Sequence, residues 1–257
     1  MLALQDRWLV QSATADGCPP WPVVFLQQGA EEKVFRERLR VRFCKQGLVR
    51  FISHRDLMRL FERALRRAGL PLAMTQGYNP HPRMSFPLAL GTGMVGEDEV
   101  MEFELREWLP PATVREALAR QLPADLRLRE LRAVNPKGGA AVAAIRYRVR
   151  FLGPPPITED RVAALLVRGS IPVRRVRKGQ EKTVDIRPFL SRLSLEEGAL
   201  VMECAVKQGS TTRPEEVLAA LGVDVVAWLP RMELTRTETV LVEEGERQGT
   251  ARQKSGG

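Results

Sequence analysis

Val100-Met-Glu-Phe-Glu-Leu-Arg106 returns 101 residues later as Val201-Met-Glu-Cys-Ala-Val-Lys207. In both copies every second residue is largely apolar, which is typical of a β-strand with one buried face. Two further segments match upstream, because Arg38-Leu-Arg-Val-Arg-Phe43 resembles Arg146-Tyr-Arg-Val-Arg-Phe151. These repeats indicate that the chain contains one structural unit twice.

Helix-start signals lie between and after these strands in both copies. The capping boxes Thr113–Glu116 and Thr212–Glu215 predict helices after the later strands, and Ser53–Asp56 and Thr158–Asp160 predict helices after the earlier ones. Each copy therefore reads strand, helix, strand, strand, helix, strand, the order of a split βαβ domain. We predict an α+β fold of two tandem ferredoxin-like (βαββαβ) units with antiparallel sheets.

The predicted domain boundaries follow from the two units. Residues 1–37 form an N-terminal extension that we expect to be mobile, and residues 38–135 form the first unit. A turn-rich linker at 136–143 leads to the second unit at 144–236, and residues 237–257 form a polar C-terminal tail.

Positive charge is concentrated in one block of the sequence. Residues 38–90 contain eleven Lys and Arg against two acidic residues, an excess of nine that equals the net charge of the whole chain. A basic block of this kind is typical of a surface that meets phosphates or another polyanion. It indicates a partner and does not identify a reaction.

Charged residues also alternate with the apolar ones along the predicted strands. In a ferredoxin-like unit the helices cover one face of the sheet, so the charged residues are expected on the open face. In the first unit these are Arg40, Arg42, Glu102 and Glu104. In the second unit they are Arg146, Arg148 and Arg150, which face mainly Glu203. Cross-strand charge pairing is one interpretation. Because aromatic residues are missing from both open faces, RRM-type base stacking is disfavoured.

The helix predicted from Ser53 to Ala68 carries a basic stripe beside its apolar face. The stripe consists of Arg55, Arg59, Arg63 and Arg66. It is either a solvated helix face or a binding site for phosphates, and the helix has few acidic residues to pair with it. His54, at the helix start, is a candidate general base or phosphate contact.

A long loop follows this helix in each unit. In the first unit Gln76–Phe86 contains the candidate recognition residues Tyr78, Asn79, His81 and Arg83. In the second unit Arg174–Pro188 contains Arg177, Lys178, Lys182 and Arg187. A rigid turn in the first unit and a plain basic hairpin with an Asp185–Arg187 interaction in the second are the alternatives.

Several classes of protein are disfavoured by the composition. The three cysteines, Cys18, Cys44 and Cys204, are too few and too far apart for a disulfide framework, a Cys-x-x-Cys metal site or an iron–sulfur centre. No apolar run approaches the length of a membrane-spanning helix. We therefore expect a cytoplasmic protein with free thiols, no metal and no cofactor.

Four motifs carry a family resemblance. The segments Arg40-Val-Arg-Phe43, Phe51-Ile-Ser-His-Arg-Asp-Leu57, Gly77-Tyr-Asn-Pro-His-Pro-Arg83 and Val184-Asp-Ile-Arg-Pro188 resemble the radical-SAM-linked protein family, a bacterial domain of unknown function, over about residues 38–240. The resemblance implies a radical-SAM-type protein as partner and supplies no established activity. Since the chain lacks radical-SAM cysteines, it would be the stand-alone form.

These observations lead to one preferred function and two alternatives. We expect a non-catalytic RNA-binding or substrate-presenting partner of a radical-SAM-type enzyme. The first alternative is a metal-independent endoribonuclease that uses His54 or His81, since the tandem plan is similar to that of CRISPR repeat-processing endoribonucleases. Their glycine-rich loop has no clear counterpart in Ala219-Ala-Leu-Gly-Val223. The second alternative is a protein-interaction module for an acidic partner.

Overall fold

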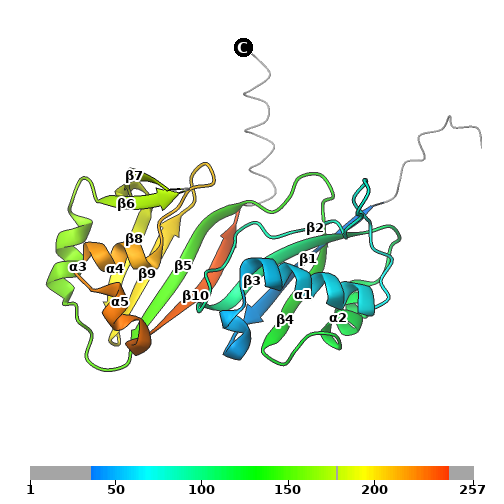
Figure 1. Cartoon of the computed structure of the whole chain (residues 1–257), viewed down its shortest axis with the longest axis horizontal. Helices are drawn as coiled ribbons and strands as arrows, with labels where there is room; N and C mark the ends of the chain where they lie inside the picture. The colour runs from blue at the N-terminus through cyan, green and yellow to red at the C-terminus, as the bar shows by residue number, and fades with distance from the viewer. Residues whose placement is uncertain (1–35, 178, 243–257) are drawn as a thin grey trace, which may run out of the picture. The chain divides into compact units, whose positions relative to one another are not determined.

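The structure is a computed structural model that describes residues 36–177 and 179–242. It is a mixed α+β fold in which a few helices pack against a mostly antiparallel central sheet (Figure 1). The predicted N-terminal extension, apart from its last two residues, lies outside the described residues, as does Lys178.

The described chain has two halves with similar elements. The first half contains β1 (Glu37–Lys45), η1 (Gly47–Phe51), α1 (His54–Arg67), β2 (Met84–Ser85), β3 (Val95–Leu105), α2 (Pro111–Ala119) and β4 (Leu126–Val134). The second half contains β5 (Val142–Phe151), α3 (Glu159–Leu166), β6 (Pro172–Arg177), β7 (Gln180–Asp185), η2 (Arg187–Phe189), β8 (Leu190–Glu196), β9 (Ala199–Ala205), α4 (Pro214–Ala220), α5 (Val225–Trp228), η3 (Leu229–Arg231) and β10 (Met232–Leu241).

One eight-stranded sheet runs through both halves, where we had predicted separate sheets. Its order is β4-β1-β3-β10-β5-β9-β8, and β2 pairs with β3. All neighbours are antiparallel except β3 and β10, which pair through Val95 with Thr235 and Gly96 with Arg236. Because β2 is only two residues long, it leaves most of the β3 edge unpaired. An open strand edge is a ready partner for another strand, and β10 pairs there.

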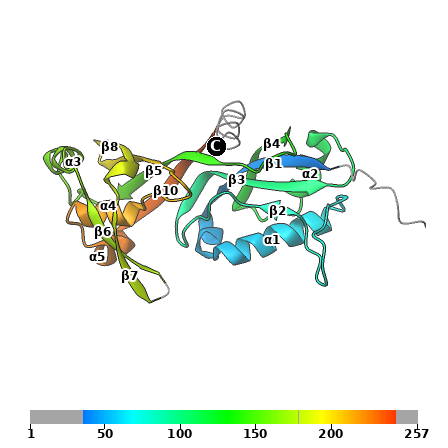
Figure 2. The same ribbon diagram turned by 90° about the horizontal axis from the view of Figure 1, so that it is seen from above.

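Two hydrophobic cores lie against this sheet. Side chains of β1, β3, α1 and α2 form the first, which includes Val41, Phe43, Phe61, Phe103 and Val114. Side chains of β5, β9, α3 and α4 form the second, which includes Ile145, Val149, Leu165, Leu200 and Val217. Figure 2 shows α1 lying on one side of β1 and β3. The loop before β3 contributes Leu90 and Met94 to the second core, so this loop joins the halves.

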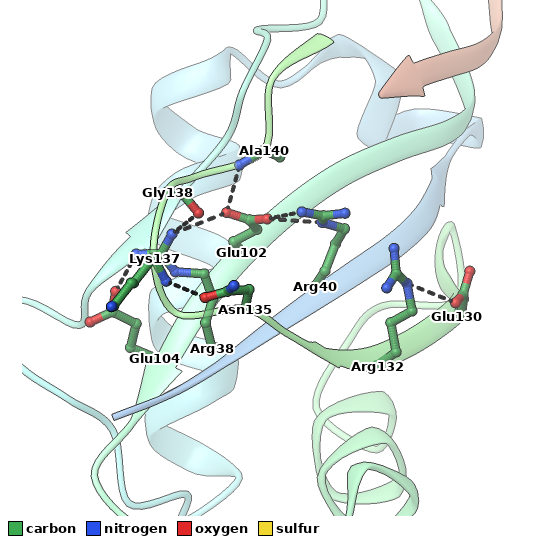
Figure 3. A network of polar contacts seen from close by, with 10 residues as sticks. All are labelled: Arg38, Arg40, Glu102, Glu104, Glu130, Arg132, Asn135, Lys137, Gly138 and Ala140. Carbon is green, nitrogen blue, oxygen red and sulfur yellow. Dashed lines mark hydrogen bonds and ion pairs between the residues drawn. The ribbon is translucent and has the colours of Figure 1, made fainter. Parts of the chain in front are cut away.

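The charged face of the first half is covered, although we had expected it to be open. We call Arg38, Arg40, Glu102 and Glu104 the first charged face. Arg40 lies opposite Glu102 in the β1–β3 register and forms an ion pair with it at 2.9 Å, which confirms cross-strand pairing. Arg40 is only 5% exposed and Glu102 only 2%. The linker is the cover, because Glu102 accepts a hydrogen bond from Ala140 N at 2.9 Å (Figure 3).

The corresponding face of the second half remains exposed. We call Arg146, Arg150, Glu203, Glu233 and Glu238 the second charged face. Arg146 donates to Glu203 at 2.8 Å and also pairs with Glu238, while Arg150 pairs with Glu233 at 3.2 Å. Two of the three carboxylates come from β10, which the sequence analysis did not include in this face. Half of the Arg146 side chain is exposed, at 47%.

Two predicted helix starts are wrong, because the N-caps are Pro110, three residues before Thr113, and Arg213, one residue after Thr212. The Thr113 capping box is absent, because α2 begins at Pro111, whose fixed φ suits the first helical position. Helix α4 likewise begins at Pro214 and not at Thr212. Its carboxylate partner is Glu216, which accepts from Arg213 N at 2.9 Å and from the Thr212 hydroxyl at 3.1 Å.

The predicted polar tail also begins too early. Residues 237–241 belong to β10, where Thr239 pairs with Ile145 and Val240 with Ala144. Residues 243–257 lie outside the described residues. The loop predicted at Arg174–Pro188 is a two-stranded hairpin, β6–β7, followed by η2.

Candidate nucleic-acid interface

Helix α1 begins where the sequence predicts. Ser53 is its N-cap, since the Ser53 hydroxyl accepts from Asp56 N at 3.2 Å and donates to the Asp56 carboxylate at 2.7 Å. The apolar face of the helix is fully buried through Leu57, Phe61 and Ala64. This packing fixes the rotation of α1 and leaves its basic stripe directed at solvent.

The arginines of this stripe are exposed and have few acidic partners. Arg59 pairs with Asp56 at 3.6 Å, and both side chains are more than half exposed. Arg66 pairs with Glu62 at 3.1 Å. Within the part of the chain that the structure describes, Arg55 and Arg63 have no ion-pair partner. Exposed ion pairs of this kind are weak, so the arginines can exchange their partners for phosphates.

The loop after α1 is a closed turn whose tip carries an exposed aromatic ring. Thr75 N donates to His81 O at 2.8 Å, and His81 N donates back to the Thr75 hydroxyl at 3.0 Å. Gly77, at the tip, has a φ of +128° that other residues rarely adopt. Tyr78 beside it is 99% exposed. A ring held so far from any protein contact is available for stacking.

Two contacts fasten this turn to α1. Arg66 donates to Pro80 O at 3.4 Å, and His81 Nδ1 lies 3.4 Å from the Glu62 carboxylate. Burial acts to raise the pKa of Glu62, but hydrogen bonds from Arg66 and His81 bring it below its ordinary value. The helix and the turn therefore form one continuous surface. We call it the α1–turn surface, made of Arg55, Arg59, Arg63, Arg66, Tyr78, Asn79 and His81.

Arg83 lies at the base of the turn and not on this surface. Its Nε donates to Met74 O at 3.2 Å, and its side chain is half-buried. Backbone hydrogen bonds from Arg83 to Ala73 and from Glu104 to Arg83 hold the base of the turn against β3. Arg83 thus lies beside Glu104, on the edge of the sheet.

The two histidines differ in access. His54 is the first residue of α1, its ring contacts Phe86 edge-on at 5.4 Å, and its Nδ1 is buried without a hydrogen-bond partner among the described residues. Burial lowers the pKa of His54, and the positive charges of Lys45 and Arg236 lower it further. His81 is 63% exposed. His54 is only partly exposed, so His81 is the more accessible of the two histidines.

The candidate residues of the second half have mixed roles. The guanidinium of Arg187 donates to Leu166 O at 3.2 Å, to Arg168 O at 3.1 Å and to Leu190 O at 3.0 Å. Arg187 therefore satisfies backbone carbonyls at the end of α3 and at the start of β8, and it has little left for a ligand. Lys182 is exposed on β7, and Arg177 ends β6. The interaction predicted between Asp185 and Arg187 exists through the backbone, since Arg187 N donates to Asp185 Oδ1 at 3.0 Å.

A buried polar cluster beneath the start of α1 was not predicted. Arg236 of β10 pairs with Glu99 of β3 at 3.1 Å and donates to Ala89 O at 2.7 Å. The fully buried Lys45 donates to Ile52 O at 3.1 Å. The cluster thereby ties the residues before α1 to both halves of the sheet. Its members are 54 to 191 residues apart in the sequence, so no local pattern could have revealed it.

Burial dominates the electrostatics of this cluster. It raises the pKa of Glu99, against the opposite effect of Arg236 and Lys45. It lowers the pKa of Lys45, an effect that Glu99 opposes. Each charge is thus held in place by a partner of the opposite sign, which is the condition for keeping charges in a core.

The described residues contain neither a cluster of metal ligands nor a helix that could span a membrane. Residues 36–177 and 179–242 contain no group of three or more His, Cys, Asp or Glu side chains that could hold a metal ion. In the same ranges no helix has the length and apolar character needed to span a bilayer.

Comparison with known proteins gives one family and several distant structures. A family model described as "Uncharacterized protein conserved in bacteria (DUF2344)" matches residues 38–214. No curated protein matches.

Among solved structures, the archaeal box H/ACA sRNP Nop10-Cbf5 complex is 12% identical with a TM-score of 0.36, covering 79% of this chain and 48% of that one. A Cbf5-Nop10-Gar1 complex is 13% identical with a TM-score of 0.39, covering 78% and 48%. An unknown protein from Galdieria sulphuraria is 14% identical with a TM-score of 0.26, covering 81% and 100%. The chain spans about half the length of the first two.

Proposed function

The chain belongs to the family described as "Uncharacterized protein conserved in bacteria (DUF2344)", and on that premise we propose that it binds single-stranded RNA through the α1–turn surface without cleaving it. The observation that carries the proposal is the stripe of exposed arginines on α1 beside the 99% exposed ring of Tyr78. Proteins that hold single strands combine a basic track for the backbone with aromatic rings on which bases stack. Sequence-specific RNA recognition also favours unpaired bases that stack on aromatic side chains.

The partner in this proposal comes from the family resemblance. The bound RNA would be presented to a radical-SAM-type enzyme, because the motifs around His54 and His81 resemble a family linked to such proteins. Affinity purification of the tagged chain from its native cell, with both protein and RNA identified, tests this partner. Recovery of RNA without a radical-SAM-type protein would remove the presenting role and keep the binding role.

We also infer that the fold consists of two ferredoxin-like units joined edge to edge. Support comes from the strand orders β4-β1-β3-β2 and β10-β5-β9-β8, since both match the order of a split βαβ domain. The β6–β7 hairpin would then be an insertion in the second unit. The joining strand pair, β3 with β10, uses the edge that the short β2 leaves open.

One observation favours the ribonuclease as a second candidate. His81 is exposed and lies 3.4 Å from Glu62, and a carboxylate beside an imidazole can orient it as a general base. A metal-independent ribonuclease would need that base within hydrogen-bond reach of a 2′-hydroxyl. The binding experiment below separates this candidate from a simple RNA-binding protein.

The test measures binding and cleavage on the same sample. Labelled single-stranded RNA is titrated with the full-length chain between 50 and 200 mM salt. If four arginines of α1 meet phosphates, the slope of log K against log salt should be roughly −3, because single strands contribute about −0.7 per contact. The RNA should stay intact in EDTA and with added Mg²⁺.

Two outcomes would contradict the proposal. Cleavage by the wild type that disappears in His54→Ala or His81→Ala, with binding retained, would identify the ribonuclease. Absence of RNA binding, together with salt-dependent binding to polyglutamate, would identify an interaction module for an acidic protein.

A further inference from the structure

The eight-stranded sheet ends in two edge strands, β4 and β8 (Figure 1). An edge strand presents N–H and C=O groups to which another strand can bind. Within residues 36–177 and 179–242, no backbone group of residues 192–196 in β8 makes a hydrogen bond outside the β8–β9 pair. This part of β8 lies at the surface, because the side chains of Arg192 and Glu196 are 65% and 45% exposed. Its outer edge is therefore available to a further strand.

The turn between β8 and β9 determines which residues face this edge. The two residues of the turn have φ values of +50° and +76°, which a type I′ turn requires. Glu196 and Ala199 flank this turn, so they form the hydrogen-bonded pair that closes it. Because hydrogen-bonded and non-hydrogen-bonded pairs alternate along an antiparallel ladder, Leu193 and Leu195 belong to non-hydrogen-bonded pairs. Their N–H and C=O groups therefore point away from β9, to the outer edge.

The sequence of β8 complements itself when two copies run antiparallel. In the register centred on Ser194, Leu193 of one copy lies opposite Leu195 of the other, and their outward N–H and C=O groups meet as hydrogen-bonded pairs. The same register places Arg192 opposite Glu196 of the second copy, on the exposed face of the sheet. These two form a non-hydrogen-bonded pair, in which side chains are close together. A two-fold axis repeats each contact, as in the commonest kind of homodimer.

Neighbouring registers lose this match. Centred one residue earlier, the pairing would place Arg192 opposite Ser194 and Glu196 opposite Leu190. Centred one residue later, it would place Glu196 opposite Ser194 and Arg192 beyond the end of the strand. Within one copy Arg192 and Glu196 form an ion pair at 2.9 Å. Exposed pairs of this kind are weak, so the two side chains can exchange it for the pairs between copies.

The opposite edge strand is less suited to pairing with itself. Strand β4 carries Arg127, Arg129 and Arg132 against one acidic residue, Glu130, so two copies of it repel each other. Its pairing with β1 is also irregular, because the register skips Arg129. A bulge inside an edge strand twists the edge away from partners. In β8 the charges balance, and the irregularity in its pairing with β9 lies before Arg192.

We propose that β8 is a dimerisation edge, which pairs antiparallel with β8 of a second copy of this chain in the register centred on Ser194. The pairing joins the eight-stranded sheets of the two copies into one. The inference does not depend on RNA binding, because β8 lies outside the α1–turn surface.

The test measures self-association of the full-length chain in the absence of RNA. Sedimentation velocity from about 1 to about 100 µM should show the wild type changing from monomer to dimer, because association follows mass action. Arg192→Glu should weaken the dimer by about tenfold or more, since like charges then lie opposite each other on both sides of the two-fold axis. Arg192→Glu/Glu196→Arg should restore it, because opposite charges face each other again. Arg132→Glu, at a 48% exposed side chain of β4, is the control and should leave association unchanged.

Amide exchange followed by NMR gives a second measurement, which needs no variant. The N–H groups of Leu193 and Leu195 should exchange more slowly as the protein concentration rises, because the dimer protects them. The outward N–H groups of β4 should exchange at the same rate throughout. This measurement stays valid if a charge variant fails to fold.

Three outcomes would overturn the inference, and none of them bears on RNA binding. The first is a chain that stays monomeric over this range, with exchange at Leu193 and Leu195 independent of concentration. The second is association that Arg132→Glu weakens and Arg192→Glu does not. The third is failure of the folded double variant to recover the dimer, which would exclude the register centred on Ser194.

Discussion

The two halves of the sheet carry the same alternation of arginine and glutamate, yet only one half covers it. In the first charged face Arg40 and Glu102 are almost fully buried under the linker. In the second charged face Arg146 and Glu203 remain 47% and 30% exposed. The pattern of charges along a strand thus predicts which side chains form ion pairs. The contribution of each ion pair to the free energy of unfolding depends on whether other parts of the chain cover it.

The first helices of the two halves differ in length and in charge. Helix α1 has fourteen residues and five arginines, four of them in an exposed stripe, while α3 has eight residues and begins with Glu159 and Asp160. The charges available to a polyanion therefore lie on a helix of the first half and not on its sheet. This difference locates the proposed RNA surface.

The largest expected effect concerns the covered face. Glu102→Ala removes the carboxylate that pairs with the buried Arg40, and removal of one partner of a buried ion pair costs about 3–5 kcal/mol. Glu203→Ala removes an exposed partner of Arg146, for which about 1 kcal/mol or less is expected. Urea unfolding of the two variants measures both values. Equal losses of stability would show that the linker does not alter the strength of these pairs.

A smaller effect is expected at the tip of the turn. Tyr78→Ala removes a ring that makes no packing contact, so stability should not change while RNA affinity falls by about 1–3 kcal/mol, the range for one stacked base. Trp108→Ala is the matched control, because Trp108 is also an exposed aromatic residue of the first half, at 62%. If both variants lose affinity equally, Tyr78 has no specific role in stacking.

Local patterns were enough to predict the main strands and α1. Alternation of apolar residues identified the central parts of β1, β3, β5 and β9, and Ser53 with Asp56 identified the start of α1. These features depend on neighbours within a few residues. The sequence also placed Tyr78 among the candidate recognition residues of the Gln76–Phe86 loop, and its ring is 99% exposed.

Features that depend on distant residues were not predicted. The cover over Glu102 is an irregular segment without periodicity, and its contact uses the backbone of Ala140. The buried pair Glu99–Arg236 joins residues 137 positions apart. Pairings of this kind are fixed by tertiary packing and leave no signal in a local window.

Binding of RNA by α1 is tested most directly by a pair of matched charge reversals. Arg55→Glu/Arg59→Glu/Arg63→Glu changes the exposed stripe, and Arg115→Glu/Arg120→Glu/Arg132→Glu makes the same change in net charge at exposed arginines elsewhere in the first half. Circular dichroism on heating checks that both variants fold. We expect the α1 variant to lose most of its affinity for single-stranded RNA. Its salt slope should be smaller than that of the wild type by about 2, because three phosphate contacts are removed. The control should keep a slope near the wild-type value. Equal loss of affinity in both variants, or an unchanged salt slope in the α1 variant, would show that α1 is not the RNA-binding surface.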